Sequence, residues 1–339
     1  MLSKAPRGTK DITPKDVYKW HYVEKKFREI CALYGYEEIR TPIFEHTEVF
    51  ARSVGDTTDV VQKEMYSFTD RGDRQLSLKP EGTAGVIRSF IENKMYADTQ
   101  PTKLYYITPC FRYERPQAGR QRQFHQFGIE VLGSDGPSVD AEVISLAVQF
   151  FNEMGLKNLS VNINSVGCPT CREEYNRKLK EYLDKKVDVL CETCLERKDK
   201  NPMRVIDCKN PHCKENLQDI PFMIDHLCED CKDHFDKLQT YLKEMDINFV
   251  VDKTIVRGLD YYKKTAFEII SNDIGSQSTV CGGGRYDGLV EMLGGPKGIS
   301  GIGFALGAER LLLTLENNNI EIENPKSTDI YIATIGDAA

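Results

Sequence analysis

The chain has 339 residues, with 45 Lys and Arg against 52 Asp and Glu, which gives a formal net charge of −7. This length predicts about two domains, and a hydrophobic fraction of 40% is ordinary for a soluble globular protein. No segment approaches the roughly 18 consecutive apolar residues of a membrane span, and the first residues lack the apolar core of a signal peptide. The acidic balance argues against unspecific coating of nucleic acid. We therefore expect a cytoplasmic protein without membrane association.

The first half of the chain predicts helices around an antiparallel hairpin. Thr13-Pro14 resembles an N-cap followed by proline, and apolar residues then recur every three or four positions up to Gly35, which predicts a helix. Segments 103–109 and 124–132 are rich in aromatic and β-branched residues, which is typical of strands. Because only a polar, arginine-rich loop separates them, we expect a hairpin with a long basic tip.

The second half predicts a helical insertion between further strands. A helix is expected over 138–154, and from 167 to 252 the composition shifts to Lys, Glu and Asp with a helical apolar pattern. A strand-like pattern then resumes, followed by a helix over 306–316. The expected strands are 265–270, 278–281, 299–305 and, after Pro325, 329–335. Because a lone strand is not stable by itself, the last one predicts the beginning of another α/β domain.

Cysteines are concentrated in the insertion, where eight of the eleven lie. A chain without an export signal stays in a reducing compartment, so we expect free thiols rather than disulfides. Pairs spaced in this way are typical half-sites of tetrahedral zinc and predict one or two sites of four cysteines each, which we expect to lie apart from the chemistry. The alternative is a set of reduced cysteines that pack among small helices. The pairs are Cys168 and Cys171, Cys191 and Cys194, Cys208 and Cys213, and Cys228 and Cys231.

Common nucleotide-binding loops do not occur in the sequence. There is no GxxxxGK[ST], and both near-matches to GxGxxG end in another residue, Asp287 or Leu306. Any ATP must therefore be held by arginines on the surface of a sheet. Planar guanidinium groups bind phosphates through paired hydrogen bonds, and an aromatic ring can stack on a base, although a solvated hairpin tip is the alternative. The hairpin loop supplies Arg112, Glu114, Arg115, Arg120, Arg122 and Phe124.

Three later segments have a functional and a structural interpretation each. In 257–262, RGLDYY, the tyrosines serve either a ligand or strand packing. The glycine-rich segment 281–288 predicts a turn, which either approaches a ligand or is merely tight. Arg310 lies one turn into the helix that follows an apolar strand, so it needs an anion, either a structural carboxylate or a ligand phosphate.

Together and in this order, the segments resemble the three signature motifs of class II aminoacyl-tRNA synthetases. IRTPIFE at 39–45, with Pro42, resembles the dimer-interface motif, FRYE at 111–114 resembles the second motif, and the segment ending in Arg310 resembles the third. Further segments are similar to histidyl-tRNA synthetases in particular, and the resemblance covers about 1–325. These segments are PRGTKDITP at 6–14, LKPEGTAG at 78–85, RGLDYY at 257–262 and GGGRYDGL at 282–289.

The resemblance implies an α+β fold, in which helices flank the antiparallel sheet of a class II synthetase and a small helical cysteine-rich domain is inserted. It also implies that ATP with Mg²⁺ activates L-histidine to histidyl-adenylate, and that histidine then passes to its tRNA. Because both partners of the first step are anions, positive charge is required. The implied catalytic residues are Arg112, Arg257 and Arg310.

The resemblance also implies binding residues for both small substrates. Glu130 would accept a hydrogen bond from one imidazole nitrogen and Tyr262 would donate to the other, so isosteres would leave polar groups unpaired. Gln126 and Glu130 are four apart on one strand and should face the same side. The implied histidine-binding residues are Glu81, Gly82, Thr83, Gln126, Glu130, Tyr261, Tyr262 and Tyr286, and the ATP-binding residues are Arg112, Glu114, Arg120, Phe124 and Arg310.

The implied organisation is a homodimer with an interrupted catalytic domain. An alternative is a catalytically inactive paralogue that regulates ATP phosphoribosyltransferase in histidine biosynthesis, but the presence of all three arginines favours an enzyme. A zinc-dependent nucleic-acid-binding module would explain only 168–231. The implied domains are the catalytic domain in two parts, 1–166 and 253–325, the helical insertion at 167–252, and the first strand of a truncated anticodon-binding domain at 326–339.

Overall fold

A computed structural model describes residues 4–55, 58, 60–259, 261–271, 279–325 and 328–333. Its main element is an eight-stranded sheet in the order β1-β5-β6-β11-β10-β9-β7-β8, next to a three-stranded sheet in the order β2-β4-β3. The strands are β1 (Glu37–Glu38), β2 (Phe44–His46), β3 (Ser67–Thr69), β4 (Gln75–Leu78), β5 (Thr102–Phe111), β6 (Gln123–Leu132), β7 (Leu159–Ser165), β8 (Phe249–Val251), β9 (Lys263–Ser271), β10 (Thr279–Arg285) and β11 (Gly301–Gly307).

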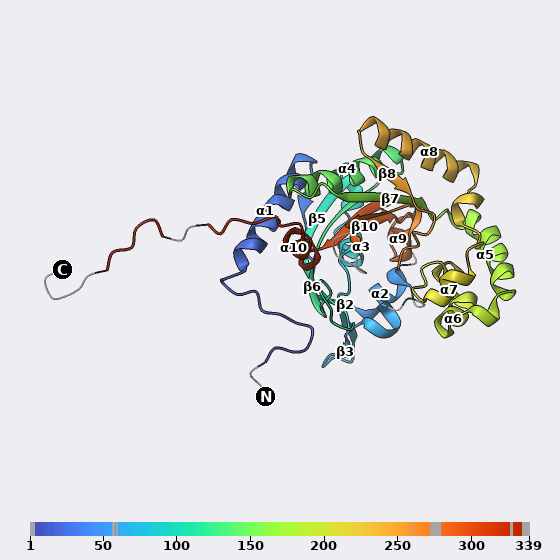
Figure 1. The fold of residues 1–339 in the computed structure, drawn as a ribbon, viewed down its shortest axis with the longest axis horizontal. Helices are drawn as coiled ribbons and strands as arrows, with labels where there is room; N and C mark the ends of the chain where they lie inside the picture. Colours follow the sequence, from blue (N-terminus) through green and yellow to red (C-terminus); the bar gives the residue numbers. More distant parts are fainter. Residues whose placement is uncertain are drawn as a thin grey trace.

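The helices cover the main sheet and form most of the insertion (Figure 1). They are α1 (Val17–Leu33), α2 (Thr47–Val54), α3 (Thr83–Glu92), α4 (Pro137–Glu153), α5 (Pro169–Asp184), α6 (Glu192–Lys200), α7 (Pro211–Asn216), α8 (Glu229–Glu244), α9 (Leu289–Met292) and α10 (Ala308–Asn317). None of the helices in the described ranges is both long and apolar enough to span a bilayer.

Strand direction agrees with the expected fold class except at the two edges. The six inner strands β5, β6, β11, β10, β9 and β7 pair in antiparallel fashion. At the edges, β1 runs parallel to β5 and β8 runs parallel to β7. The predicted hairpin is confirmed as β5 and β6, which pair in register from Thr102 with Leu132 to Phe111 with Gln123.

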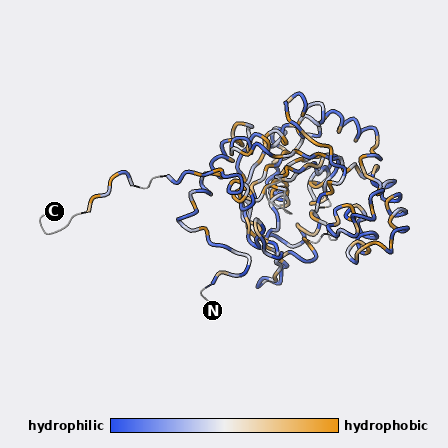
Figure 2. Tube along the Cα trace, viewed as in Figure 1, coloured by the Kyte–Doolittle hydropathy of each residue, from blue (hydrophilic) through white to orange (hydrophobic). Residues whose placement is uncertain are grey.

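Alternation along β6 separates the hydrophobic core from the functional face of the sheet. Phe127, Ile129 and Val131 are buried in the core beneath α1, α4, α8 and α10. The residues between them point to the opposite face because successive side chains of a strand alternate. Figure 2 shows the resulting pattern, with apolar chain concentrated in the strands and polar chain on the outer helices.

Three sequence expectations differ from the structure. The first helix begins at Val17 with Asp16 as its N-cap, because Thr13 and Pro14 lie in the turn before it. In the glycine-rich segment, 281–285 belong to the inner strand β10, whose backbone is paired on both sides, and only the end of the segment, at 287–288, forms a turn. The strand expected at 329–335 is not formed over the described residues 328–333, which run away from the sheet and have no partner there (Figure 1); residues 334–335, like 278 of another expected strand, lie outside the described part.

A buried ion pair connects the helices to the main sheet. Arg285 on β10 and Asp140 on α4 are both fully buried, and the Arg285 guanidinium donates to the Asp140 carboxylate. Two further partners bind the second carboxylate oxygen, the His234 ring nitrogen at 2.8 Å and the Thr265 hydroxyl at 2.5 Å. Because His234 lies on α8, this network also attaches the end of the insertion to the main sheet.

We expect the replacement Asp140→Ala to destabilise the protein strongly. It would leave the Arg285 guanidinium buried without its counter-ion, a loss of about 3–5 kcal/mol in the free energy of unfolding. Urea denaturation of the purified chain measures this change. The matched control is Asp233→Ala, which removes an exposed ion pair with Lys237 on α8 and should leave the free energy of unfolding nearly unchanged. Equal losses in both variants would contradict the role assigned to the network.

Candidate active site

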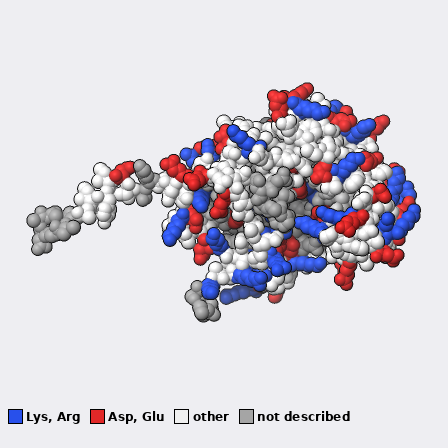
Figure 3. Space-filling model, in the orientation of Figure 1, with Lys and Arg blue, Asp and Glu red and all other residues white. Residues whose placement is uncertain are grey.

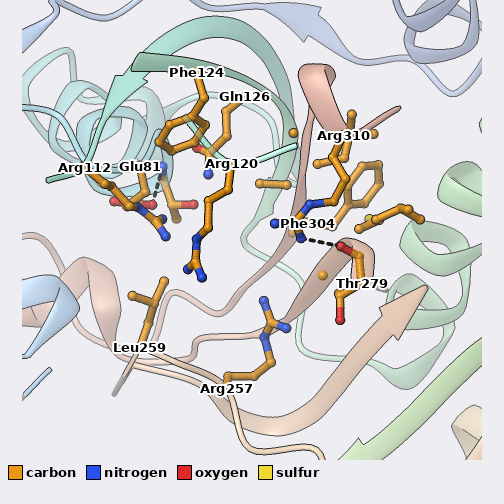
Figure 4. A pocket seen from close by; sticks show the side chains of 18 of the residues that line it. Glu81, Arg112, Arg120, Phe124, Gln126, Arg257, Leu259, Thr279, Phe304 and Arg310 are labelled. Atoms are coloured by element: carbon orange, nitrogen blue, oxygen red, sulfur yellow. Dashed lines mark hydrogen bonds between the residues drawn. The ribbon is translucent and has the colours of Figure 1, made fainter. Parts of the chain in front are cut away.

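A pocket opens on the face of the main sheet that α1, α4 and α10 do not cover. Its floor is formed by β6, β10 and β11, and its walls by the hairpin loop, by the beginnings of α3 and α10, and by Arg257, Leu259, Tyr261 and Tyr262. Figure 4 shows the guanidinium groups of Arg112, Arg120, Arg257 and Arg310 directed into one cavity from different elements. Its lining also includes Glu81, Thr83, Glu114, Gln121, Phe124, Gln126, Glu130, Lys209, Tyr261, Tyr262, Thr279, Tyr286 and Glu309.

Each of the three predicted catalytic arginines is held by a local partner. Arg112 donates from Nε to the Pro80 carbonyl at 2.8 Å and lies 5.4 Å from the centre of the Phe124 ring. Arg257 pairs with Glu268 on β9 at 2.5 Å. Arg310 donates to the Thr279 carbonyl at 2.6 Å. These contacts fix the side chains, whose guanidinium groups are directed into the cavity (Figure 4).

The arginines in the pocket lie close enough together to repel one another. Burial lowers the pKa of Arg310, and the nearby Arg120 and Arg112 lower it further, with Glu114 acting in the opposite sense. Arg120 pairs with Glu114 across the hairpin loop. A polyanion bound in the pocket would relieve this repulsion, because opposite charge within a few ångströms favours the charged form of each arginine.

The other end of the pocket is organised by the first turn of α3. Glu81 accepts hydrogen bonds from the backbone amides of Thr83 and Ala84, both at 2.8 Å. Gln126 on β6 accepts from the Gly82 amide at 2.9 Å. Carboxylate and amide oxygens therefore meet here, which provides acceptors for a cationic group such as an α-ammonium.

Glu130 lies on the floor of the pocket and is almost completely buried. Its carboxylate accepts from the hydroxyl groups of Thr83 at 2.7 Å, Tyr106 at 3.3 Å and Tyr286 at 2.5 Å. A side chain at Gly303 would put its first carbon within 2.1 Å of this carboxylate, so only glycine leaves room for it. Burial raises the pKa of Glu130 to about 8 despite the three hydroxyl donors.

Three tyrosines close the pocket around Glu130. The ring centres of Tyr261 and Tyr262 are 4.6 Å apart, and those of Tyr261 and Tyr286 are 5.7 Å apart. Burial is the main cause that raises the pKa of Tyr262 above its usual value, so its hydroxyl keeps its proton and remains a donor. The preceding residue of the motif, Asp260, lies outside the described residues.

Most of the residues predicted from the sequence line this one pocket, and three do not. Gly82 lies behind the lining, where its amide bonds Gln126. Arg115 is exposed at the hairpin tip, and Arg122 lies on the Tyr113 ring at 3.9 Å. Gln126 and Glu130 do share one side of β6, as expected from their spacing.

Sequence reasoning missed several residues of the pocket. Glu309 accepts a hydrogen bond from the backbone amide of His125 at 2.9 Å. Because it directly precedes Arg310, its position next to the third motif could have predicted its place in the pocket. Tyr106 lies outside the lining, but it contacts Glu130 diagonally from the neighbouring strand, where the hairpin register places it opposite Gly128. Lys209 comes from the insertion, and no local pattern predicts its place in the pocket.

The insertion brings its eight cysteines together in two groups. All Sγ atoms of a group lie within 4.8 Å of one another, and all eleven cysteines of the chain are free thiols. The first group is Cys168, Cys171, Cys228 and Cys231, and the second is Cys191, Cys194, Cys208 and Cys213. Each group therefore combines two of the predicted pairs.

Comparisons with known proteins agree with the site. The family model described as histidyl-tRNA synthetase matches residues 8–311. A histidine--tRNA ligase of Clostridioides difficile (strain 630) is 81% identical over all 339 residues, which span 81% of that relative. The crystal structure of apo S. aureus histidyl-tRNA synthetase is 43% identical with a TM-score of 0.81, over 98% of this chain and 79% of that one. An ATP phosphoribosyltransferase regulatory subunit/histidyl-tRNA synthetase from Bacillus halodurans C is 22% identical with a TM-score of 0.63, over 94% and 83% of the two chains.

The raised pKa of Glu130 predicts a specific dependence of stability on pH. Between pH about 4.5 and 8 the folded protein keeps a proton on Glu130 that the unfolded chain releases. The unfolded state then binds fewer protons, so the free energy of unfolding falls as pH rises through this window, by several kcal/mol at most. Glu130→Gln cannot ionise, and its stability should lack this decline. Chemical denaturation of parent and variant from pH 5 to 9 measures both slopes; parallel curves would exclude Glu130 as the source.

Proposed function

The chain belongs to the histidyl-tRNA synthetase family, and from this premise we propose that its arginine-lined pocket is where its histidine--tRNA ligase reaction takes place. In this reaction an oxygen of the histidine carboxylate bonds to the α-phosphorus of ATP, and pyrophosphate leaves. A ribose hydroxyl at the end of the tRNA then takes the histidyl group, and AMP leaves. The observation that carries the proposal is the single pocket in which buried acceptors for an amino acid adjoin converging arginines.

We assign the phosphate end of the pocket to Arg112, Arg257 and Arg310. Both reactants of the first step are negative, so their approach costs electrostatic energy that fixed guanidinium groups offset. Arg257 is rigidly held between Glu268 and the ring of Tyr262, which lies 5.4 Å away. Arg257 would therefore meet the α-phosphate and the carboxylate, while Arg112 and Arg310 bracket the nucleotide.

The adenine end is assigned to the hairpin loop. Phe124 already stacks on Arg112, which leaves its other face to a base. Arg120 and Glu114 form a pair whose polar atoms border the same part of the pocket. Such a loop selects a nucleotide by stacking and charge, without a glycine-rich phosphate loop.

Histidine fits the opposite end of the pocket. Glu81, Thr83 and Gln126 would receive the α-ammonium, and Gly82 supports them through its amide. Glu130 would accept a hydrogen bond from one imidazole nitrogen once it is ionised, and Tyr262 would donate to the other. Tyr261 and Tyr286, whose ring centres are 5.7 Å apart, would exclude water from the bound imidazole ring.

Mg²⁺ accompanies ATP in the reaction, and the pocket offers ligands that suit it. Glu114 and Glu309 both line the pocket, and carboxylate oxygens are the hard ligands that Mg²⁺ prefers. We propose that these two residues hold the ion, which neutralises phosphate charge when bound.

The regulatory paralogue is the weaker alternative. The relative whose name includes a regulatory subunit is 22% identical, and such a likeness establishes the fold alone. Arg112, Arg257 and Arg310 are all directed into the pocket of the present chain, which a protein that only senses histidine would not require.

We also propose a catalytic domain in two parts, 1–166 and 253–325, with the helical insertion at 167–252 between them. A cytoplasmic location and structural zinc in the insertion belong to the same proposal. The helical part of the insertion contains both cysteine groups, although β8 near its end joins the main sheet. Free thiols throughout the chain agree with a reducing compartment. Figure 3 shows Lys and Arg interspersed with Asp and Glu over this face of the molecule, so binding of tRNA would depend on local basic groups.

The decisive experiment is histidine-dependent exchange of pyrophosphate into ATP, which requires no tRNA. We expect the parent chain to be active and Arg257→Ala to be slower by about 10²–10³-fold, the scale of a lost transition-state donor. Arg115→Ala is the matched control, because Arg115 is exposed outside the pocket, and it should exchange like the parent. Unchanged exchange in Arg257→Ala would remove this residue from the catalytic set.

A homodimer is proposed from the segment that resembles the class II dimer motif. Its residues Ile43 and Phe44 are 46% and 52% exposed, and Phe68 on β3 is 43% exposed beside them, an apolar surface that a second copy would cover. Light scattering at micromolar concentration should give twice the chain mass, and Phe44→Asp should shift the equilibrium toward monomer. A parent that scatters as a monomer contradicts this assembly.

A further inference from the structure

The two cysteine groups are nested in the sequence. The outer group joins the first and last pairs of the insertion, Cys168/Cys171 with Cys228/Cys231, and the inner group joins the two pairs between them. The outer group thus closes the insertion where the chain leaves β7 and where it returns through α8. The inner group closes a smaller lobe that contains α6 and α7.

Distances between sulfur atoms match a tetrahedral metal site. A zinc–sulfur bond of about 2.3 Å places tetrahedral ligands about 3.8 Å apart. The Sγ atom of Cys168 lies 3.5 Å from that of Cys171 and 3.9 Å from that of Cys228, and in the inner group Cys191 and Cys208 are 3.8 Å apart. A disulfide would need about 2.05 Å, so these separations exclude disulfides and fit four ligands around one ion.

Backbone amides support the sulfur atoms in both groups. The amide of Cys228 donates to the Cys171 sulfur at 3.1 Å, and the amide of Cys191 donates to the Cys213 sulfur at 3.1 Å. Such outer hydrogen bonds offset the negative charge of coordinating thiolates and orient them. Four soft thiolates in a tetrahedron select zinc among the common divalent ions of cells.

The two helices of the inner lobe bury little besides their cysteines, although Met203 and Val205 between them are buried. The single buried residue among the nine of α6 is Cys194, and among the six of α7 it is Cys213. Helices that bury nothing else cannot be held by a hydrophobic core of their own. Metal binding would add free energy of folding where these helices contribute little, because a preformed site of four thiolates does not exist in the unfolded chain.

Both groups are connected to the active-site segment 257–262 by basic residues close to them in sequence. Arg172 follows Cys171, and its guanidinium donates to the carbonyl groups of Val166, at 2.9 Å, and Tyr262. Arg204, four residues before Cys208, donates to the Arg257 carbonyl at 3.3 Å.

One residue of the inner lobe reaches the cavity itself. Lys209 follows Cys208 directly and lines the pocket together with Arg120 and Arg310. The backbone that follows Lys209 is also attached to Cys208, because the Asn210 amide donates to the Cys208 sulfur at 3.4 Å. An ion bound by Cys208 would therefore also determine where Lys209 stands.

We propose that the insertion binds two zinc ions, one in each cysteine group, and that these ions hold Arg172, Arg204 and Lys209 against the pocket in which ATP is bound. The second half of this inference rests on the proposed function of that pocket. It departs from the expectation that zinc would lie apart from the chemistry. Arg172 and Arg204 are positioning residues for the backbone of Tyr262 and Arg257, and Lys209 adds a cation at the phosphate end.

Metal content tests the first half without any activity measurement. Elemental analysis of the full chain, purified without chelator, should find about two zinc ions per chain. Reconstitution with Co²⁺ should give the intense visible absorption of tetrahedral thiolate sites. Less than about 0.2 zinc per chain, with all eight thiols reacting as free in the native state, would overturn the metal sites.

Single ligand replacements test whether the sites are separate. Cys191→Ser and Cys228→Ser change half-buried ligands of the inner and outer groups, and each should lose one of the two ions. Cys31→Ala is the matched control, a buried cysteine on α1 outside both groups, and should keep two. Loss of both ions in either variant would contradict two independent sites.

Kinetics of pyrophosphate exchange test the connection to the pocket. Cys191→Ser should raise the KM for ATP by about 10-fold, and Cys191→His, which retains a zinc ligand, should restore both metal and KM. Lys209→Ala should raise this KM by about 3- to 5-fold, whereas Lys214→Ala on α7 should not. A zinc-depleted Cys191→Ser with the KM of the parent would overturn the connection. Exchange absent from the parent itself would refute the proposed function and leave the zinc content standing.

Discussion

The Glu130 carboxylate and the Arg257 guanidinium can pack directly against the backbone of β11 and β10, because glycines leave room for them on the pocket face of these strands. A first side-chain carbon at Gly303 would collide with the Glu130 carboxylate, and one at Gly282 would come within 2.6 Å of the Arg257 guanidinium. The two strands still pair with each other without interruption from Cys281 with Leu306 to Arg285 with Ile302. The pocket therefore depends on a floor of bare backbone, on which long charged side chains from other elements are laid.

Charge is compensated differently on the two sides of this sheet. Arg285 is closed into a complete network with Asp140, His234 and backbone carbonyl groups, and nothing is left for a ligand. In the pocket, burial and neighbouring arginines depress the pKa of Arg310. The paired Arg285 and Asp140 hold the structure rigid, whereas the excess positive charge of the pocket arginines favours binding of a negatively charged substrate. The sheet thus separates a structural use of arginine from a binding use.

The sequence predicted best what depends on local periodicity. The β5–β6 hairpin and the side shared by Gln126 and Glu130 follow from a strand period of two, and the structure has both. The glycine segment was misjudged because glycines permit a turn and a crowded strand equally well, and only the neighbours of β10 decide between them. The place of Lys209 depends on how the insertion folds back, a long-range contact without a local signature. The roles of the pocket residues remain predictions.

The nested arrangement of the cysteines has a consequence for the order in which the insertion assembles. Bringing Cys171 and Cys228 together closes a span of 57 residues, whereas Cys191 and Cys208 are 17 apart. Since chain entropy penalises closure by (3/2)RT ln n, the wide span costs about 1 kcal/mol more. If the inner group forms first, residues 191–208 are no longer flexible chain. Fewer flexible residues then separate Cys171 from Cys228, and closing the outer group costs less entropy. The chain order of the pairs therefore favours assembly from the centre of the insertion outward, and the catalytic sheet receives a lobe that is already formed.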